Sequence, residues 1–266
     1  MTVLDPDRAR TAIVEHTRRL ADAVATIDPT APVPTAPEWT AADLVAHLGQ
    51  TQHWVAEIIE RRIADPTQLP TTVVAAPTDP GEWTAWLDKA AHRVADACSA
   101  DALAASVFNA AGDERTGGQF WLISMVNEAV VHGVDGAVAA GRRAEVEPDI
   151  AGALISNHLA MLTSPTWELQ RPESAHALRG TGQTLQWLAT DSADGDQGWF
   201  VERRPDGVTV RVGGRDADVT VSGSAASLLL LLTRRLPLAA ARADVTVEGD
   251  SELVRHWIES TAHVSG

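Results

Sequence analysis

Glu128 and His132 lie four residues apart in the apolar stretch FWLISMVNEAVVHGVDGAVAAGR, which covers residues 120–142. Residues four apart on a helix lie one turn from each other on the same face. A carboxylate and an imidazole that point into an apolar face are costly unless something pairs with them. A divalent metal is one such partner, although a polar pair at this spacing more often belongs to a solvated face or a satisfied core contact.

A third candidate ligand is His47, on an earlier predicted helix. His47, Glu128 and His132 would supply two histidines and one carboxylate, a set that leaves a fourth metal position open and occurs in catalytic zinc sites. Asp43, one turn before His47, and Asp135, three residues after His132, are candidates for orienting a ligand imidazole. A charge at a helix start for Asp43 and a solvated side chain for Asp135 are equally good alternatives.

Other groups show no comparable pattern. His53 and Glu57 are also four residues apart, but His53 points away from the His47 face and is interpreted as a surface residue. The single cysteine, Cys98, is interpreted as a small buried hydrophobic residue rather than a nucleophile. Trp54 and Trp121 are candidates for lining the site.

The elements that must position these side chains are predicted to be helices. Apolar residues at helical spacing predict helices near residues 5–27, 40–64, 81–99, 120–142 and 148–162, which suit a four-helix bundle with long connections. At the start of the second helix, Thr40 and Asp43 form a weak capping box, while Trp39 and Leu44 form a hydrophobic staple. Gly141 is predicted to end the helix that carries Glu128. The Pro-rich connection 28–39 is predicted to form neither helix nor sheet ladder.

Near residue 163 the pattern changes. Residues 163–174 are interpreted as a linker. Beyond it, alternating residues predict strands over 176–180, 184–190, 198–203, 207–213, 218–223 and 244–248, with helices over 224–235 and 251–260. The residues RPDG (204–207) predict a hairpin between the strands 198–203 and 207–213. The predicted fold is therefore a helical bundle over residues 1–163, followed by a small α+β domain with a mainly antiparallel sheet over residues 174–266.

Composition limits the partners. The formal net charge of −15 and the pI near 4.9 argue against nucleic-acid or anionic-membrane binding, which needs a basic patch. The N-terminus has charges throughout and lacks the apolar core of a signal peptide, and the longest apolar run, Leu228–Leu232, is too short to span a bilayer. We expect a cytoplasmic protein, monomeric or homodimeric, that binds neither nucleic acid nor membrane.

Two motifs resemble the mycothiol-dependent maleylpyruvate isomerase family. PTAPEWTAADLVAHLGQTQHWV (34–55) is similar to its opening Pro-x-Trp-Thr-x-x-Asp-Leu-x-x-His-Leu, and GGQFWLISMVNEAVVHGVDGAVAAG (117–141) is similar to its Trp-containing helix with Glu-x3-His-x2-Asp. VSGSAASLLLLLTRR and VTVEGDSELVRHW resemble its C-terminal domain. The resemblance therefore covers nearly the whole chain, in order.

This resemblance implies a DinB-like bundle whose metal ligands fall on His47, Glu128 and His132, with zinc as the usual divalent metal and Glu128 essential for catalysis. It implies mycothiol as the thiol cosubstrate of a small-molecule electrophile. A free thiol has a pKa of about 8.5, and zinc coordination deprotonates it. The thiolate would add to the cis double bond of maleylpyruvate, and bond rotation and thiol expulsion would give fumarylpyruvate. A thiol S-transferase needs the same activated thiolate.

The sequence departs from the family pattern at two places. Members commonly have Arg directly after the second His, where this chain has Gly133, and a Gly-Arg pair is expected near Thr233–Arg235. A carboxylate substrate favours an arginine partner, for which Arg234 and Arg235 are candidates, Arg235 being assigned to catalysis. Compensation of a helix C-terminus is their alternative role. A non-catalytic metal-binding regulatory protein and a metal-dependent hydrolase remain alternative functions.

Overall fold

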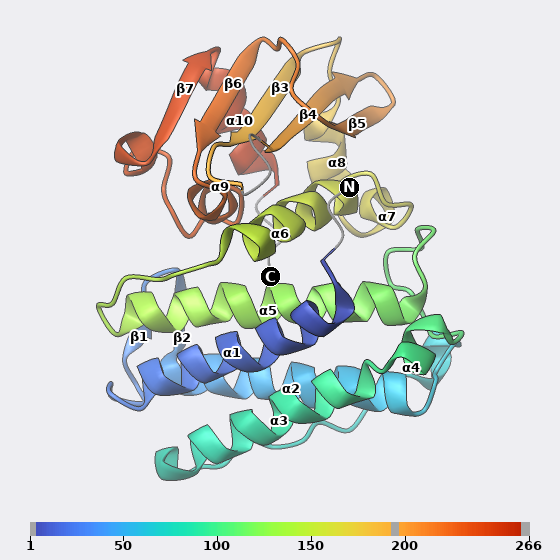
Figure 1. Ribbon diagram of the computed structural model, residues 1–266, viewed down its shortest axis with the longest axis vertical. Helices are drawn as coiled ribbons and strands as arrows, with labels where there is room; N and C mark the ends of the chain where they lie inside the picture. Colours follow the sequence, from blue (N-terminus) through green and yellow to red (C-terminus); the bar gives the residue numbers. More distant parts are fainter. Residues whose placement is uncertain (1–3, 193–196, 262–266) are drawn as a thin grey trace. The chain divides into compact units, whose positions relative to one another are not determined.

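The computed structural model describes residues 4–192 and 197–261. The chain forms two compact units, which we describe separately (Figure 1). The bundle unit comprises Asp5–Ala110 and Glu114–Glu145, and the sheet unit comprises Leu4, Ala111–Asp113 and the chain from Val146 onward. This mixed architecture of helices and a mainly antiparallel sheet agrees with the predicted fold class.

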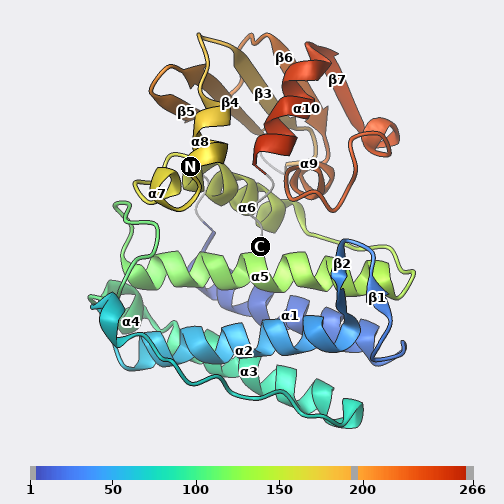
Figure 2. The same ribbon diagram turned by 180° about the vertical axis from the view of Figure 1, so that it is seen from behind.

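Four long helices build the bundle unit, and a short fifth, α4, packs against the last of them. Helix α1 packs against α5 and α3, and helix α2 packs against the same two (Figures 1 and 2). Their bounds are α1 Pro6–Val24, α2 Ala41–Glu60, α3 Trp83–Ala97, α4 Ala100–Ala104 and α5 Gly117–Ala139. The predicted helices of this unit are therefore confirmed, with ends that differ by a few residues: α1, α2 and α3 are shorter than predicted, and α5 begins and ends three residues earlier.

The predicted caps mark where α2 begins and where α5 ends. Thr40 and Asp43 form a complete capping box, since each side chain accepts a hydrogen bond from the other residue's backbone N–H. Gly141, at φ 66°, follows the end of α5 in the left-handed conformation that glycine adopts without steric cost. An N-cap such as Thr40 contributes about 1 kcal/mol. The two caps therefore fix one end of each helix that carries a candidate ligand, α2 with His47 and α5 with Glu128.

The Pro-rich connection before α2 is more ordered than predicted. It contains a short antiparallel hairpin of β1, Pro32–Val33, and β2, Ala36–Thr40. The expectation of no sheet ladder is wrong because proline removes a donor only at its own position, and a two-stranded edge needs few donors. Val33 is fully buried in the bundle core, so the hairpin is attached to the helices.

In the sheet unit, helix α6 (Pro148–Met161) packs against helix α9 (Ala225–Leu232). The boundary between the compact units thus falls before α6, whereas the sequence placed the domain boundary at residue 163. Two short helices follow, α7 Trp167–Gln170 and α8 Pro172–Leu178. The predicted strand over 176–180 is wrong: Pro172 starts a helix, a position where its missing N–H costs nothing.

A five-stranded sheet in the order β5-β4-β3-β6-β7 completes this unit. All neighbours are antiparallel except β3 and β6, which pair in parallel. The elements are β3 Thr184–Ala189, β4 Gln197–Arg204, β5 Gly207–Val212, β6 Val219–Gly223, β7 Val245–Gly249 and the closing helix α10 Ser251–Ser260. The predicted strands from residue 184 onward are confirmed, including the hairpin whose turn is RPDG.

Arg234 carries the chain out of α9 in a left-handed conformation at φ 62°. The N–H of Arg234 bonds Leu231 O and the N–H of Arg235 bonds Leu230 O, the pattern of a Schellman cap that glycine usually completes. We expect Arg234→Gly to stabilise the protein by about 0.5–1 kcal/mol, measured by urea unfolding, because it removes the Cβ clash. Arg235→Gly is the control and should destabilise, since the Arg235 guanidinium also bonds Thr233 O. A lower stability of Arg234→Gly would contradict this interpretation.

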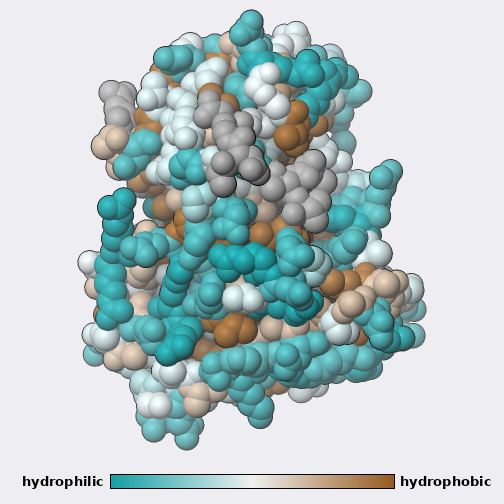
Figure 3. All heavy atoms as spheres, in the orientation of Figure 1, coloured by the Kyte–Doolittle hydropathy of each residue, from teal (hydrophilic) through white to brown (hydrophobic). Residues whose placement is uncertain are grey.

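In Figure 3 hydrophilic residues dominate the visible surface over α1 and α3, with small hydrophobic areas between them. The large hydrophobic side chains exposed in the described part of the chain are Val73, Val74, Leu169 and Val212. Within the described ranges, every helix is too short or too polar to cross a lipid bilayer.

Candidate metal centre

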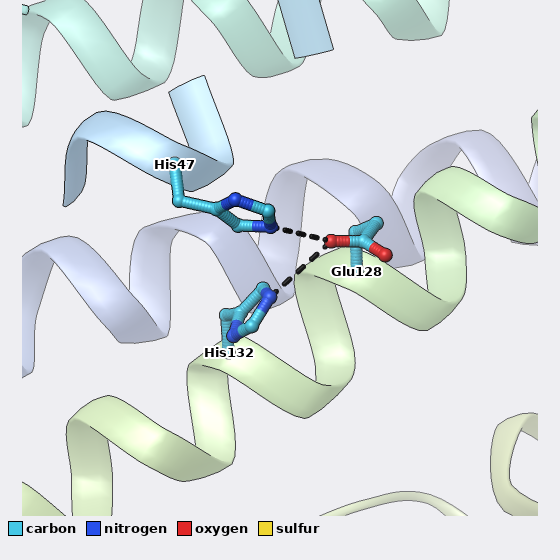
Figure 4. A group of neighbouring side chains, drawn as sticks. All are labelled: His47, Glu128 and His132. Carbon is cyan, nitrogen blue, oxygen red and sulfur yellow. Dashed lines mark hydrogen bonds and ion pairs between the residues drawn. The ribbon is translucent and has the colours of Figure 1, made fainter. Parts of the chain in front are cut away.

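His47 on α2 and Glu128 and His132 on α5 come together where the two helices face each other (Figure 4). Glu128 Oε2 lies 3.1 Å from His47 Nε2 and 3.2 Å from His132 Nε2. One ligand atom from each residue lies within 4.8 Å of the other two. The structure therefore brings together the three side chains that the sequence selected, from segments 81 residues apart.

The charged side chains of the site shift one another's pKa values. Burial by itself raises the pKa of Glu128, but hydrogen bonds from His132 and His47 and their charges outweigh it and lower the value to about 2. Burial lowers the pKa of His132, but hydrogen bonds to Asp135 and Glu128 together with their charges raise it to about 9. An ionised carboxylate thus sits between two imidazoles and attracts positive charge.

Asp135 orients His132 from its far side. Its Oδ2 lies 2.9 Å from His132 Nδ1, and both side chains are buried. Because a carboxylate accepts hydrogen bonds, this contact places a proton on Nδ1 and directs Nε2 toward Glu128. The orienting role that the sequence suggested for Asp135 is supported by this geometry, and the solvated alternative is wrong.

The residues fit a divalent metal. With the proton on Nδ1, a neutral His132 would direct the lone pair of Nε2 at the carboxylate oxygen of Glu128, so two acceptors would face each other at 3.2 Å. Either a second proton on the imidazole or a cation bound by both atoms resolves this contact. Zinc takes nitrogen and oxygen ligands of these types, and an oriented histidine is typical of such sites.

Trp39 is a site residue that the sequence analysis missed. Its ring centroid lies 4.7 Å from that of His47 and 5.6 Å from that of His132. The residue had been assigned only to a hydrophobic staple, and it does pack against the core cluster that includes Leu44. Its position directly before the N-cap of α2 was the available signal, because that position lies beside the helix turn that carries His47.

Asp43, Trp54 and Trp121, which the sequence also suggested for the site, make other contacts. Asp43 is occupied by the α2 cap, since its Oδ2 accepts from the Thr40 hydroxyl and N–H, so its alternative reading as a helix-start charge is the correct one. Trp54 and Trp121 form an edge-to-face pair with ring centroids 5.5 Å apart, two helical turns from His47 and Glu128. Each indole N–H donates to a loop carbonyl.

The interpretation of His53 as a surface residue is wrong. It is only 5% exposed and lies near Arg93 and Trp86 of α3. Burial, followed by the positive charges of Arg93 and Lys89, lowers its pKa. Cys98 is fully buried, and burial raises the pKa of its thiol to about 12, which makes it a poor nucleophile.

The two departures from the family pattern have structural correlates. Gly133 lies against α1, where a Cβ would come within 3.1 Å of His16 O, and it lines a cavity of about 250 Å³. Arg234 adopts the left-handed conformation expected of the glycine in a Gly-Arg pair. Arg235 follows it and donates to Thr233 O at the end of α9, which fits the alternative role of compensating a helix C-terminus.

Comparisons with known proteins agree with these motifs. Two family models match: the mycothiol maleylpyruvate isomerase N-terminal domain over residues 10–137, and the MDMPI C-terminal domain over residues 175–256. Crystal structures of the mycothiol-dependent maleylpyruvate isomerase and of its histidine-to-alanine variant give TM-scores of 0.55 and 0.56. Each is 16% identical and covers 93% of this chain and 96% of its own, a likeness that shows the fold. No curated protein matches the chain.

Proposed function

The chain belongs to the mycothiol maleylpyruvate isomerase family, and from this premise we propose that it is a zinc-dependent enzyme that uses mycothiol to attack a small electrophile. The observation that carries the proposal is the convergence of His47 Nε2, Glu128 Oε2 and His132 Nε2 from two facing helices. All three residues lie in the part of the chain that the N-terminal family model matches.

Each side chain has a separate task in this proposal. His47, Glu128 and His132 would hold a divalent metal and leave one position open for the thiol. When bound, zinc supplies Lewis acidity that deprotonates a coordinated thiol near neutral pH. Glu128 contributes the negative charge of the ligand set, and Asp135 keeps the lone pair of His132 Nε2 available. Trp39 covers both imidazoles and reduces their exposure to water.

We propose thiol addition as the shared chemical step. The thiolate sulfur would add to one carbon of a cis double bond and leave the negative charge on the neighbouring carbon as an enolate. Rotation about the resulting single bond and expulsion of the thiolate would give isomerisation, whereas protonation of that carbon with the carbon–sulfur bond retained would give S-transfer. We favour the broader S-transferase description, with cis–trans isomerisation of maleylpyruvate as the specific case. Arg235 is proposed to bind a substrate carboxylate in either reaction.

A thiol-omission assay tests this function. Zinc-loaded protein is incubated with maleylpyruvate and with a panel of simple electrophiles, with and without mycothiol, and products are followed by mass spectrometry. The proposal predicts turnover only with the thiol, as fumarylpyruvate or as a thiol adduct. Turnover without thiol would instead indicate a metal-dependent hydrolase, and zinc binding without any turnover would indicate a binding or regulatory protein.

A further inference from the structure

The β1–β2 hairpin reaches the metal centre through Thr35. The Thr35 hydroxyl donates to Asp135 Oδ1 at 2.6 Å, across 100 residues of sequence. The other oxygen of the same carboxylate, Oδ2, lies 2.9 Å from His132 Nδ1. A continuous line of hydrogen bonds therefore runs from the hairpin hydroxyl through Asp135 to a candidate metal ligand.

The hairpin is a rigid base for this hydroxyl. Two residues before Thr35, the side chain of Val33 is fully buried in the bundle core. Two backbone hydrogen bonds join the segments that precede and follow the hairpin: Ala41 N–H donates to Ala31 O at 2.9 Å and Ala42 N–H donates to Pro29 O at 3.0 Å. Prolines at positions 32 and 34 restrict the backbone further, because the ring fixes φ. Thr35 consequently has little freedom to leave Asp135.

A carboxylate with a single hydrogen bond can rotate about its terminal torsion, which is broad in energy. A second bond, to Oδ1, restrains the carboxylate plane and so keeps Oδ2 aimed at the imidazole. We propose that Thr35 is a positioning residue of the metal centre, whose hydroxyl fixes Asp135 and thereby keeps the His132 ring oriented with its proton on Nδ1. The inference rests on the proposed metal-dependent function.

The second strand of the hairpin supports the same conclusion. It ends at Trp39 and Thr40, and the Trp39 ring lies against both His47 and His132. The hairpin thus contacts the candidate ligands in two ways, through a hydrogen bond at its turn and an aromatic ring near its end. Its role extends beyond connecting α1 to α2.

The hydroxyl can be removed without loss of volume. Thr35→Val is expected to weaken zinc binding about tenfold, the lower end of the effect of outer-shell partners, whereas Thr35→Ser keeps a hydroxyl and should bind within about twofold of the wild type. Thr30→Val is the matched control, because it removes a Thr–Asp hydrogen bond of 2.5 Å, to Asp28, in the same connection but away from the site. Affinity is measured by competition with a chromogenic chelator, and folding by thermal unfolding of the metal-free proteins.

A second readout reports on the imidazole itself. In the metal-free protein, nitrogen-15 NMR should show a His132 Nδ1 proton that exchanges more slowly with solvent in the wild type and Thr35→Ser than in Thr35→Val. The positioning role would be overturned if Thr35→Val changed neither the exchange rate nor the zinc affinity. It would also be overturned if Thr35→Ser and Thr30→Val lost as much zinc affinity as Thr35→Val. If the wild type bound no metal, the proposed function would fail, while the exchange comparison would still decide the role of Thr35.

Discussion

Glu128→Gln is expected to weaken zinc binding by at least about 100-fold, more than the loss of an outer partner, and to remove thiol-dependent turnover accordingly. The substitution keeps the shape of the side chain but removes the charge that lies between His47 Nε2 and His132 Nε2. A neutral amide oxygen is a weaker ligand for a divalent cation, and its NH2 group would oppose one imidazole. Chelator competition and the thiol-omission assay measure the two effects.

Glu57→Gln is the control for this prediction. Glu57 also lies on a bundle helix, but its carboxylate pairs with Arg61, so its replacement should leave zinc affinity and turnover unchanged. Thermal unfolding shows whether both variants keep the fold. If Glu128→Gln retained thiol-dependent turnover at the wild-type rate, the assignment of Glu128 to the site would be wrong.

Zinc affinity is expected to rise about 100-fold between pH 6 and pH 8. Metal binding requires an unprotonated Nε2 on His132. In the metal-free protein this imidazole is protonated, because the hydrogen bonds and charges of Asp135 and Glu128 outweigh burial and raise its pKa to about 9. The metal therefore displaces one proton below pH 9, and the apparent affinity changes about tenfold per pH unit. Glu128, with its pKa lowered to about 2, stays ionised throughout.

The raised pKa of His132 has the opposite effect on the stability of the metal-free protein, which falls as the pH rises. A raised histidine pKa contributes stability below the unfolded value near 6.5, and this contribution is lost as the pH rises toward about 9. Metal-free and zinc-loaded protein should therefore diverge in unfolding temperature as the pH increases. In Asp135→Asn the pKa of His132 should fall, so the affinity should level off at a lower pH. A wild-type affinity that is flat from pH 6 to pH 8 would contradict the proton displacement.

The ligand set could be predicted from sequence because it depends on local helix geometry and on two motifs. The four-residue spacing puts Glu128 and His132 on one face of α5, and the capping box at Thr40 fixes where α2 carries His47. Resemblance to a family was still needed, since spacing alone also fits a solvated face. The sheet from residue 184 onward followed from alternation and the RPDG turn.

The elements that sequence reasoning missed depend on contacts between distant segments. Thr35 meets Asp135 only because a hairpin in a Pro-rich connection packs against α5. The burial of His53 depends on α3, which no local pattern on α2 reveals. In residues 176–180 the apolar pattern was too short to distinguish a strand from a helix, and Pro172 determined the helix start.

Metal content per chain tests the central claim most directly. Wild-type protein and His132→Ala are loaded with zinc, desalted and measured by mass spectrometry under native conditions, with thermal unfolding as the check on folding. The three-ligand centre predicts close to one zinc per wild-type chain and little in the variant, because two ligands hold zinc poorly. A folded wild type that retains no metal, or a variant that retains as much as the wild type, would contradict it.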